Sequence, residues 1–309
     1  MTRETKLDGL GAAPRWIAAC LGVYMLVDLL ALYLWSSAGQ AFPIQAPSDS
    51  SSALPVTAMA GVGFWLCLAV VRSFPAGTTL RPAWMLITFA AATKVVSGLL
   101  SEFLGSDWIL NPLLWSGHAQ SGLMGYIRLG ASIAGGPIRL AVLAAAMLVV
   151  LRILRKFGFE GEPNATEWAV CGVVFLFTLC SFAEAALTGR QIGMEDWPRL
   201  AGLPLLCVLF VEAMALRQSV VRLGHGPIAR CWTAFVGGIF LTGLAEMALW
   251  LIPHYSRAPL AIVESLAGFL TAAVFALAPA YQLAAQRRAI KPAGNLPEEL
   301  STTIPAVAR

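Results

Sequence analysis

The feature that most constrains this chain is a series of eight apolar segments, each about as long as a membrane is thick. A helix that crosses the hydrocarbon core of a bilayer needs about 20 mostly apolar residues. The separators carry Pro, Gly and Ser residues, which end helices and favour turns. The predicted spans cover residues 16–36, 54–73, 82–104, 137–156, 166–188, 199–218, 231–253 and 258–285.

Composition excludes the other classes. Charged residues make up 12 % of the chain and the apolar set AVILMFWYC makes up 58 %, whereas a soluble domain carries about 25 % charged residues. Disordered, collagen-like and disulfide-scaffold chains are excluded on the same grounds. We therefore predict an all-α integral membrane protein with a single transmembrane domain over residues 1–290. The polar tail 291–309 is predicted to be disordered and cytoplasmic.

Basic residues predict the orientation of the spans, because cytoplasmic loops of membrane proteins are enriched in Lys and Arg. With the N-terminus in the cytoplasm, most of the 21 basic residues lie on the cytoplasmic side, which predicts that both termini are cytoplasmic. The net charge of +4 then indicates contact with anionic lipid rather than with nucleic acid. We expect a cell membrane location, the inner membrane for a bacterial protein. The basic residues assigned to the outer side are Arg128, Arg139, Arg190, Arg199 and Arg257.

Two segments allow a second interpretation. The first span precedes Ala38-Gly39-Gln40-Ala41, whose small residues resemble a signal-peptide cleavage site, but its apolar stretch is longer than such peptides have. The glycine-rich stretch 122–137 either dips into the membrane as a re-entrant segment or lies on the outer surface as an interfacial helix. The interfacial helix is favoured, because re-entrant backbone must be shielded by protein or water.

The eight spans are predicted to form four tandem helical hairpins. In each hairpin the outward-running helix carries one carboxylate in its outer half. The segment Leu179–Leu187 also matches Leu241–Leu249 at five of nine positions. Such similarity indicates either internal duplication, as in many transporters, or chance agreement between two Ala- and Leu-rich segments.

Charged residues within the spans are the candidate functional residues. An ionised side chain at the centre of a spanning helix costs about 2.5–3.5 kcal/mol, so such residues mark ion or substrate pathways. Lys94, near the middle of its span, is expected to pair with a carboxylate from another helix, Asp28 being the first choice. We predict a proton-linked binding site that faces the outer side; the alternative is a structural ion pair. The predicted site residues are Asp28, Lys94, Glu102, Glu184 and Glu246.

Two further carboxylates are weaker candidates. Glu212 lies in the inner half of its span, and a pairing with Arg217 is expected. Glu264 lies about two turns into the last span, from which its side chain can reach the outer interface.

Motifs of known chemistry are absent from the sequence. There is no nucleotide-binding, metalloprotease or hydrolase motif, and the six cysteines show no CxxC spacing. His118 and His254 lie in predicted loops and do not indicate a metal or haem site. Asn164-Ala165-Thr166 fits a glycosylation sequon but falls in a loop predicted to be cytoplasmic. No cofactor, metal or catalytic residue is predicted.

The sequence thus favours a proton-linked transporter or channel for a small polar or cationic solute. One alternative is a non-catalytic membrane subunit or assembly factor, in which the acidic residues hold a membrane protein partner. The other is an intramembrane enzyme that uses a carboxylic acid on a lipid or isoprenoid. The expected partners are the lipid bilayer, protons and a small solute.

Overall fold

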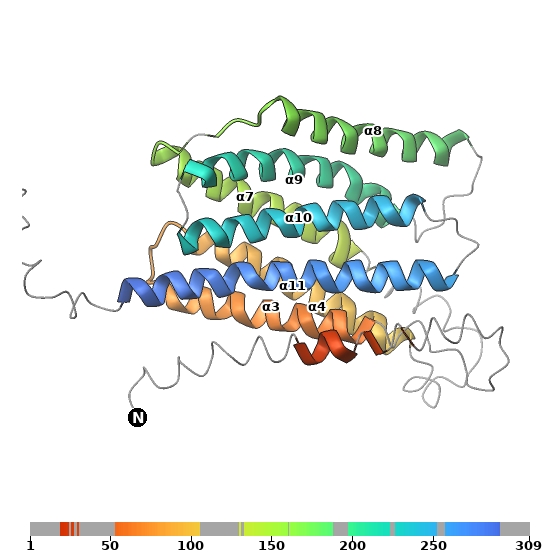
Figure 1. Ribbon diagram of the computed structural model, residues 1–309, viewed down its shortest axis with the longest axis horizontal. Helices are drawn as coiled ribbons and strands as arrows, with labels where there is room; N and C mark the ends of the chain where they lie inside the picture. The colour runs from red at the N-terminus through yellow and green to blue at the C-terminus, as the bar shows by residue number, and fades with distance from the viewer. Residues whose placement is uncertain are drawn as a thin grey trace, which may run out of the picture.

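The computed structural model describes residues 19–24, 26, 27, 30, 53–105, 130, 133–159, 161–187, 197–222, 226–251 and 257–290. These parts of the chain are helical and contain no strand (Figure 1). The helices are α3 (Ala53–Ser73), α4 (Arg81–Gly105), the π-helix η1 (Ala134–Ile138), α7 (Arg139–Lys156), α8 (Ala165–Leu187), α9 (Trp197–Arg222), α10 (Pro227–Leu251) and α11 (Arg257–Ile290).

Within the described residues, six helices are long and apolar enough to cross a membrane. They coincide with six predicted spans, and their ends differ from the prediction by up to eight residues. The fifth predicted span is helix α8, whose described apolar stretch, Ala165–Phe177, is shorter than a span. The first predicted span lies mostly outside the described residues. The chain is therefore an all-helical, multi-pass membrane protein. The six crossing stretches are Leu54–Ser73, Arg81–Leu100, Ala134–Lys156, Ala201–Arg222, Pro227–Ala245 and Leu266–Gln286.

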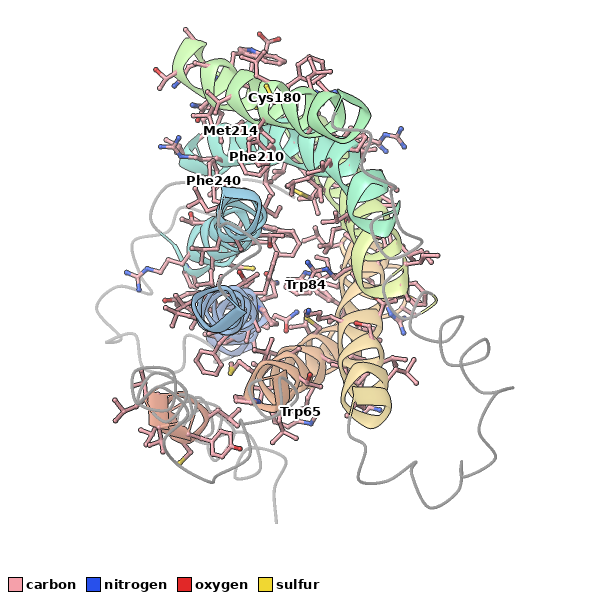
Figure 2. The ribbon with its side chains drawn as sticks, turned by 90° about the vertical axis from the view of Figure 1, so that its right-hand side faces the viewer. Trp65, Trp84, Cys180, Phe210, Met214 and Phe240 are labelled. Atoms are coloured by element: carbon pink, nitrogen blue, oxygen red, sulfur yellow. The ribbon has the colours of Figure 1, made fainter. Side chains whose placement is uncertain are left out.

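The six crossing helices form a closed ring. Helix α3 packs on α4, α4 on α7, α7 on α9, α9 on α10, α10 on α11, and α11 again on α3. Figure 2, which looks along the helices, shows this ring and places α8 outside it, beyond α9. Consecutive predicted spans do pack together, but so do spans from different predicted hairpins. The arrangement as four hairpins therefore stays a prediction.

The relative direction of α3 and α11 follows from a hydrogen bond between their ends. The hydroxyl of Ser73, at the end of α3, donates a 2.5 Å hydrogen bond to the Gln286 side chain near the end of α11. Helices α3 and α11 are therefore parallel. One end of the bundle collects most of the basic residues, and we call it the Arg-rich end (left in Figure 1). It holds Arg72, Arg81, Arg155, Lys156, Arg222 and Arg230. That this end faces the cytoplasm stays a prediction.

The fourth span begins earlier than predicted, in a π-helical turn. Residues 134–138 include Gly135, Gly136 and Pro137 and continue directly into α7. Because Pro137 has no backbone N–H, it cannot make an α-helical hydrogen bond at this point, and a wider turn accommodates it. The end of the stretch 122–137 is thus part of a spanning helix. Residues 122–129 lie outside the described residues, so the choice between re-entrant and interfacial is untested.

Small residues let the ring helices approach closely. A Cβ built on Gly98 of α4 would overlap the side chain of Thr57 on α3, and one built on Gly135 would overlap Ser97. Within a membrane, helices associate through such close packing, since lipid is as apolar as the helix surface. Glycine at these positions therefore sets the spacing of α3, α4 and η1.

We expect Gly98→Ala to lower the unfolding free energy by about 1–3 kcal/mol, the usual cost of overpacking. Thr57→Ala in the same chain should restore most of the loss, because it removes the overlapping hydroxyl and methyl. The matched control is Gly61→Ala on α3, where a new Cβ meets nothing within 4 Å. Thermal unfolding in detergent measures the stability of the unchanged protein and of the three variants. Equal stability of the Gly98 and Gly61 variants would contradict the packing argument.

Candidate functional site

Aromatic side chains fill the interior of the ring near the Arg-rich end. The rings of Trp84 on α4 and Trp232 on α10 have centroids 5.8 Å apart, although α4 and α10 are not neighbours in the ring. Trp232 also contacts Phe235, which contacts Phe275 of α11 at 5.4 Å. Figure 2 shows Trp84 inside the ring of helices. We call Trp84, Trp232, Phe235 and Phe275 the aromatic plug.

Polar side chains lie beyond the plug at one level. Lys94 and Thr242 are 13 and 15 residues from the Arg-rich ends of α4 and α10, and Thr271 is 15 residues from Gln286, which accepts the hydrogen bond from Ser73 at the Arg-rich end of α3. At about 1.5 Å per residue this is about 20 Å along the bundle. Thr242 and Thr271 are both buried, and Thr271 Oγ1 has no hydrogen-bond partner among the described residues. Three ring helices thus carry a polar group at the same depth.

Lys94, Thr242 and Thr271 lie on the sides of their helices that face the ring interior. Lys94 is nine residues after the exposed Met85, a separation of 180°, so it lies opposite the lipid-facing side of α4. Thr242 follows Phe235 by two turns, and Thr271 precedes Phe275 by one turn. Each threonine therefore shares a helix face with a member of the aromatic plug.

The predicted site residues are described to different extents. Lys94 is half-buried on the inward face of α4. Glu102, Glu184 and Glu246 have described backbones on α4, α8 and α10, while their side chains lie outside the described residues, as does Asp28 altogether. By register Glu246 follows Phe235 by 11 residues, about three turns, and so lies on the inward face of α10. Glu184 is on α8, outside the ring. That these carboxylates lie close together in one site stays a prediction.

The expected pairing of Glu212 with Arg217 is wrong. Arg217 Nη1 donates a 2.7 Å hydrogen bond to Glu167 Oε1 instead. Five residues separate Glu212 from Arg217, which turns their side chains about 140° apart on the helix, whereas partners on one helix lie three or four residues apart. Glu212 is 6 % exposed, and its Oε2 has no hydrogen-bond partner among the described residues. It is the one carboxylate within the six crossing stretches of the described residues.

Glu167, which was not predicted from the sequence as a functional residue, joins α8 to α9. Its backbone N–H donates to Asn164 Oδ1, and the N–H of Asn164 donates to Glu167 Oε2, both at 2.9 Å. This reciprocal pair is the capping box of a helix start. Glu167 also accepts hydrogen bonds from Arg217 and Gln218. The sequence Asn164-Ala165-Thr166-Glu167 fits the capping-box pattern and could have indicated this role. Only its first three residues were interpreted, as a glycosylation sequon.

The part of the chain that the structure describes holds no group of three or more His, Cys, Asp and Glu side chains that could bind a metal. His118, His225 and His254 lie outside the described residues. The prediction that no metal or cofactor is bound is not tested by these observations.

The ring and its helices define the class of the protein: a multi-pass, all-helical membrane protein. The chain matches no protein-family model, no curated protein and no solved structure. Its function must therefore be argued from the ring interior itself.

Proposed function

We propose that the protein is a proton-linked carrier for a small polar or cationic solute, with its binding site in the ring interior. The observation that carries the proposal is the level at which Lys94, Thr242 and Thr271 lie, beyond the aromatic plug. Charged residues within membrane spans commonly mark ion or substrate pathways, so Lys94 is the central residue of the proposed site.

The aromatic plug supports a carrier rather than an open channel. Carriers expose a site near the middle of the membrane to one side at a time. In the proposed carrier, the plug closes the interior toward the Arg-rich end, and the solute would reach Lys94 from the opposite end. Movement of α4 relative to α10 would separate Trp84 from Trp232 and open the other side.

The predicted carboxylates would complete the site. Glu246 shares the inward face of α10 and lies one turn beyond Thr242, so it is the first candidate partner for the solute or for Lys94. Glu102 is 18 residues after Trp84, five turns along the same helix. A carboxylate near Lys94 gives a pair in which proton binding and cation binding compete, which is the basis of coupling.

Flux in proteoliposomes tests the proposal. The purified protein is reconstituted with a trapped pH-sensitive dye, a pH gradient is imposed, and a panel of small amines and metal cations is added in turn. Solute-dependent proton movement above that of protein-free vesicles is expected. Lys94→Gln should reduce it at least about tenfold, because the removed charge is worth about 1.4 kcal/mol or more in this setting.

Lys156→Gln is the matched control. It makes the same chemical change at an exposed residue at the end of α7, and should leave the flux unchanged. Unchanged flux in Lys94→Gln, or no solute-dependent flux in the wild type with any compound, would refute the carrier.

A further inference from the structure

An open groove lies between α9 and α10 on the outside of the ring, near the Arg-rich end. Its volume is about 270 Å³, and it is lined by Arg217, Thr233, Val236, Gly237 and Phe240. Thr233 is exposed, and the Arg217 side chain is 55 % exposed. The groove therefore opens toward lipid and is separate from the ring interior that holds Lys94.

The two ends of the groove differ in chemistry. Arg217 lies at the Arg-rich end, held in place through Nη1 by Glu167. A guanidinium has five N–H donors, so this contact leaves donors for a second oxygen ligand. Further along α10, Val236, Gly237 and Phe240 offer an apolar floor. Gly237 contributes no side chain, and the nearest atom to a Cβ built there belongs to Val274, at 3.7 Å.

The charge around the groove is positive. Arg230 is exposed and precedes Thr233 by three residues, which puts both on the same face of α10. Glu167 offsets the charge of Arg217, and Arg230 adds a positive charge at the same end. A positive head and an apolar floor running toward the membrane centre match a lipid with an anionic headgroup.

We propose that this groove binds one anionic glycerophospholipid from the leaflet at the Arg-rich end. Its phosphate accepts hydrogen bonds from Arg217 and is attracted by Arg230, since arginine binds phosphate in a forked geometry. The first part of an acyl chain lies over Val236 and Gly237 and against Phe240. The binding is independent of the proposed carrier activity.

Native mass spectrometry of the full-length protein in detergent tests this site. Phosphatidylglycerol and phosphatidylcholine with identical acyl chains are titrated separately, and the first bound lipid is counted. Phosphatidylglycerol should bind at a concentration about tenfold lower. Gly237→Leu, which fills the groove, and Arg230→Gln should each remove most of this preference. Neither variant touches the Glu167–Arg217 pair, but a side chain at position 237 also approaches Val274 of α11, so thermal unfolding of both variants in detergent is measured alongside to check that they are folded.

Arg155→Gln is the control, since Arg155 is an exposed arginine at the same end, on α7 and away from the groove. It should leave phosphatidylglycerol binding unchanged. Equal binding of the two lipids, unchanged binding in Gly237→Leu and Arg230→Gln, or an equal loss in Arg155→Gln would overturn the proposal. Phosphatidylglycerol binding that persists when proton flux is lost in Lys94→Gln would confirm that the two sites are independent.

Discussion

Trp84→Ala is expected to lower the unfolding free energy by about 3–5 kcal/mol, the cost of deleting a large buried side chain. Trp84 is fully buried, and its contact with Trp232 bridges two helices that are not neighbours in the ring. Trp65→Ala on α3 is the matched control, since Trp65 is 45 % exposed and lies at the edge of the bundle (Figure 2). Denaturation in mixed micelles measures both variants.

Trp84→Phe distinguishes the contribution of the aromatic contact to stability from that of the indole N–H. Trp84 Nε1 has no hydrogen-bond partner among the described residues, so phenylalanine loses volume but no described hydrogen bond. We expect a smaller loss than in Trp84→Ala. A double-mutant cycle of Trp84 and Trp232 should give a coupling free energy of about 0.5–1.5 kcal/mol, as measured for aromatic pairs. Zero coupling, or equal losses in Trp84→Ala and Trp65→Ala, would refute the plug.

Glu167→Ala is expected to release the start of α8 from α9. The change removes the capping box, worth about 1 kcal/mol, and hydrogen bonds to a buried carboxylate, worth about 1.5–3 kcal/mol each. Because the Arg217 side chain is 55 % exposed, the ion pair itself adds less. We expect a local loss of about 2–4 kcal/mol, seen as faster amide hydrogen exchange in residues 165–177.

Glu162→Ala is the control for this prediction. Glu162 is exposed, five residues earlier in the same segment, and its loss should not change exchange in α8. The ring helices α3, α4 and α7 should keep their protection in both variants, because α8 lies outside the ring. Equal exchange rates in α8 of the Glu162 and Glu167 variants would contradict the role assigned to Glu167.

The positions of the spans could be predicted from the sequence because each depends on a local property. Six predicted spans, 54–73 among them, coincide with helices able to cross a membrane. The start of the fourth span was missed by three residues, because Gly135 and Gly136 were assigned to the glycine-rich stretch 122–137, predicted to be interfacial or re-entrant. A proline within the first turns of a membrane helix is tolerated when a wider turn accommodates the lost bond.

The candidate site was predicted less completely. Lys94 could be selected from the sequence, because a lysine in an apolar segment stands out. Thr242 could be placed on the inward face of its helix, because it precedes Glu246 by one turn. Thr271 could not be selected, since threonine is common in membrane helices and only the ring places it beside the plug. The partner of Arg217 was also out of reach, because Glu167 lies 50 residues away on another helix.

By itself, the sequence determined that the chain crosses a membrane several times as helices, since about 20 apolar residues in a row can satisfy their backbone in lipid only as a helix. Tertiary structure alone decided which helices surround the interior and which one, α8, lies outside. Segments as alike as Leu179–Leu187 and Leu241–Leu249 belong to an outer and a ring helix, respectively. The reason is that helices in lipid choose neighbours by close fit of small and aromatic side chains, which depends on residues far apart in the sequence.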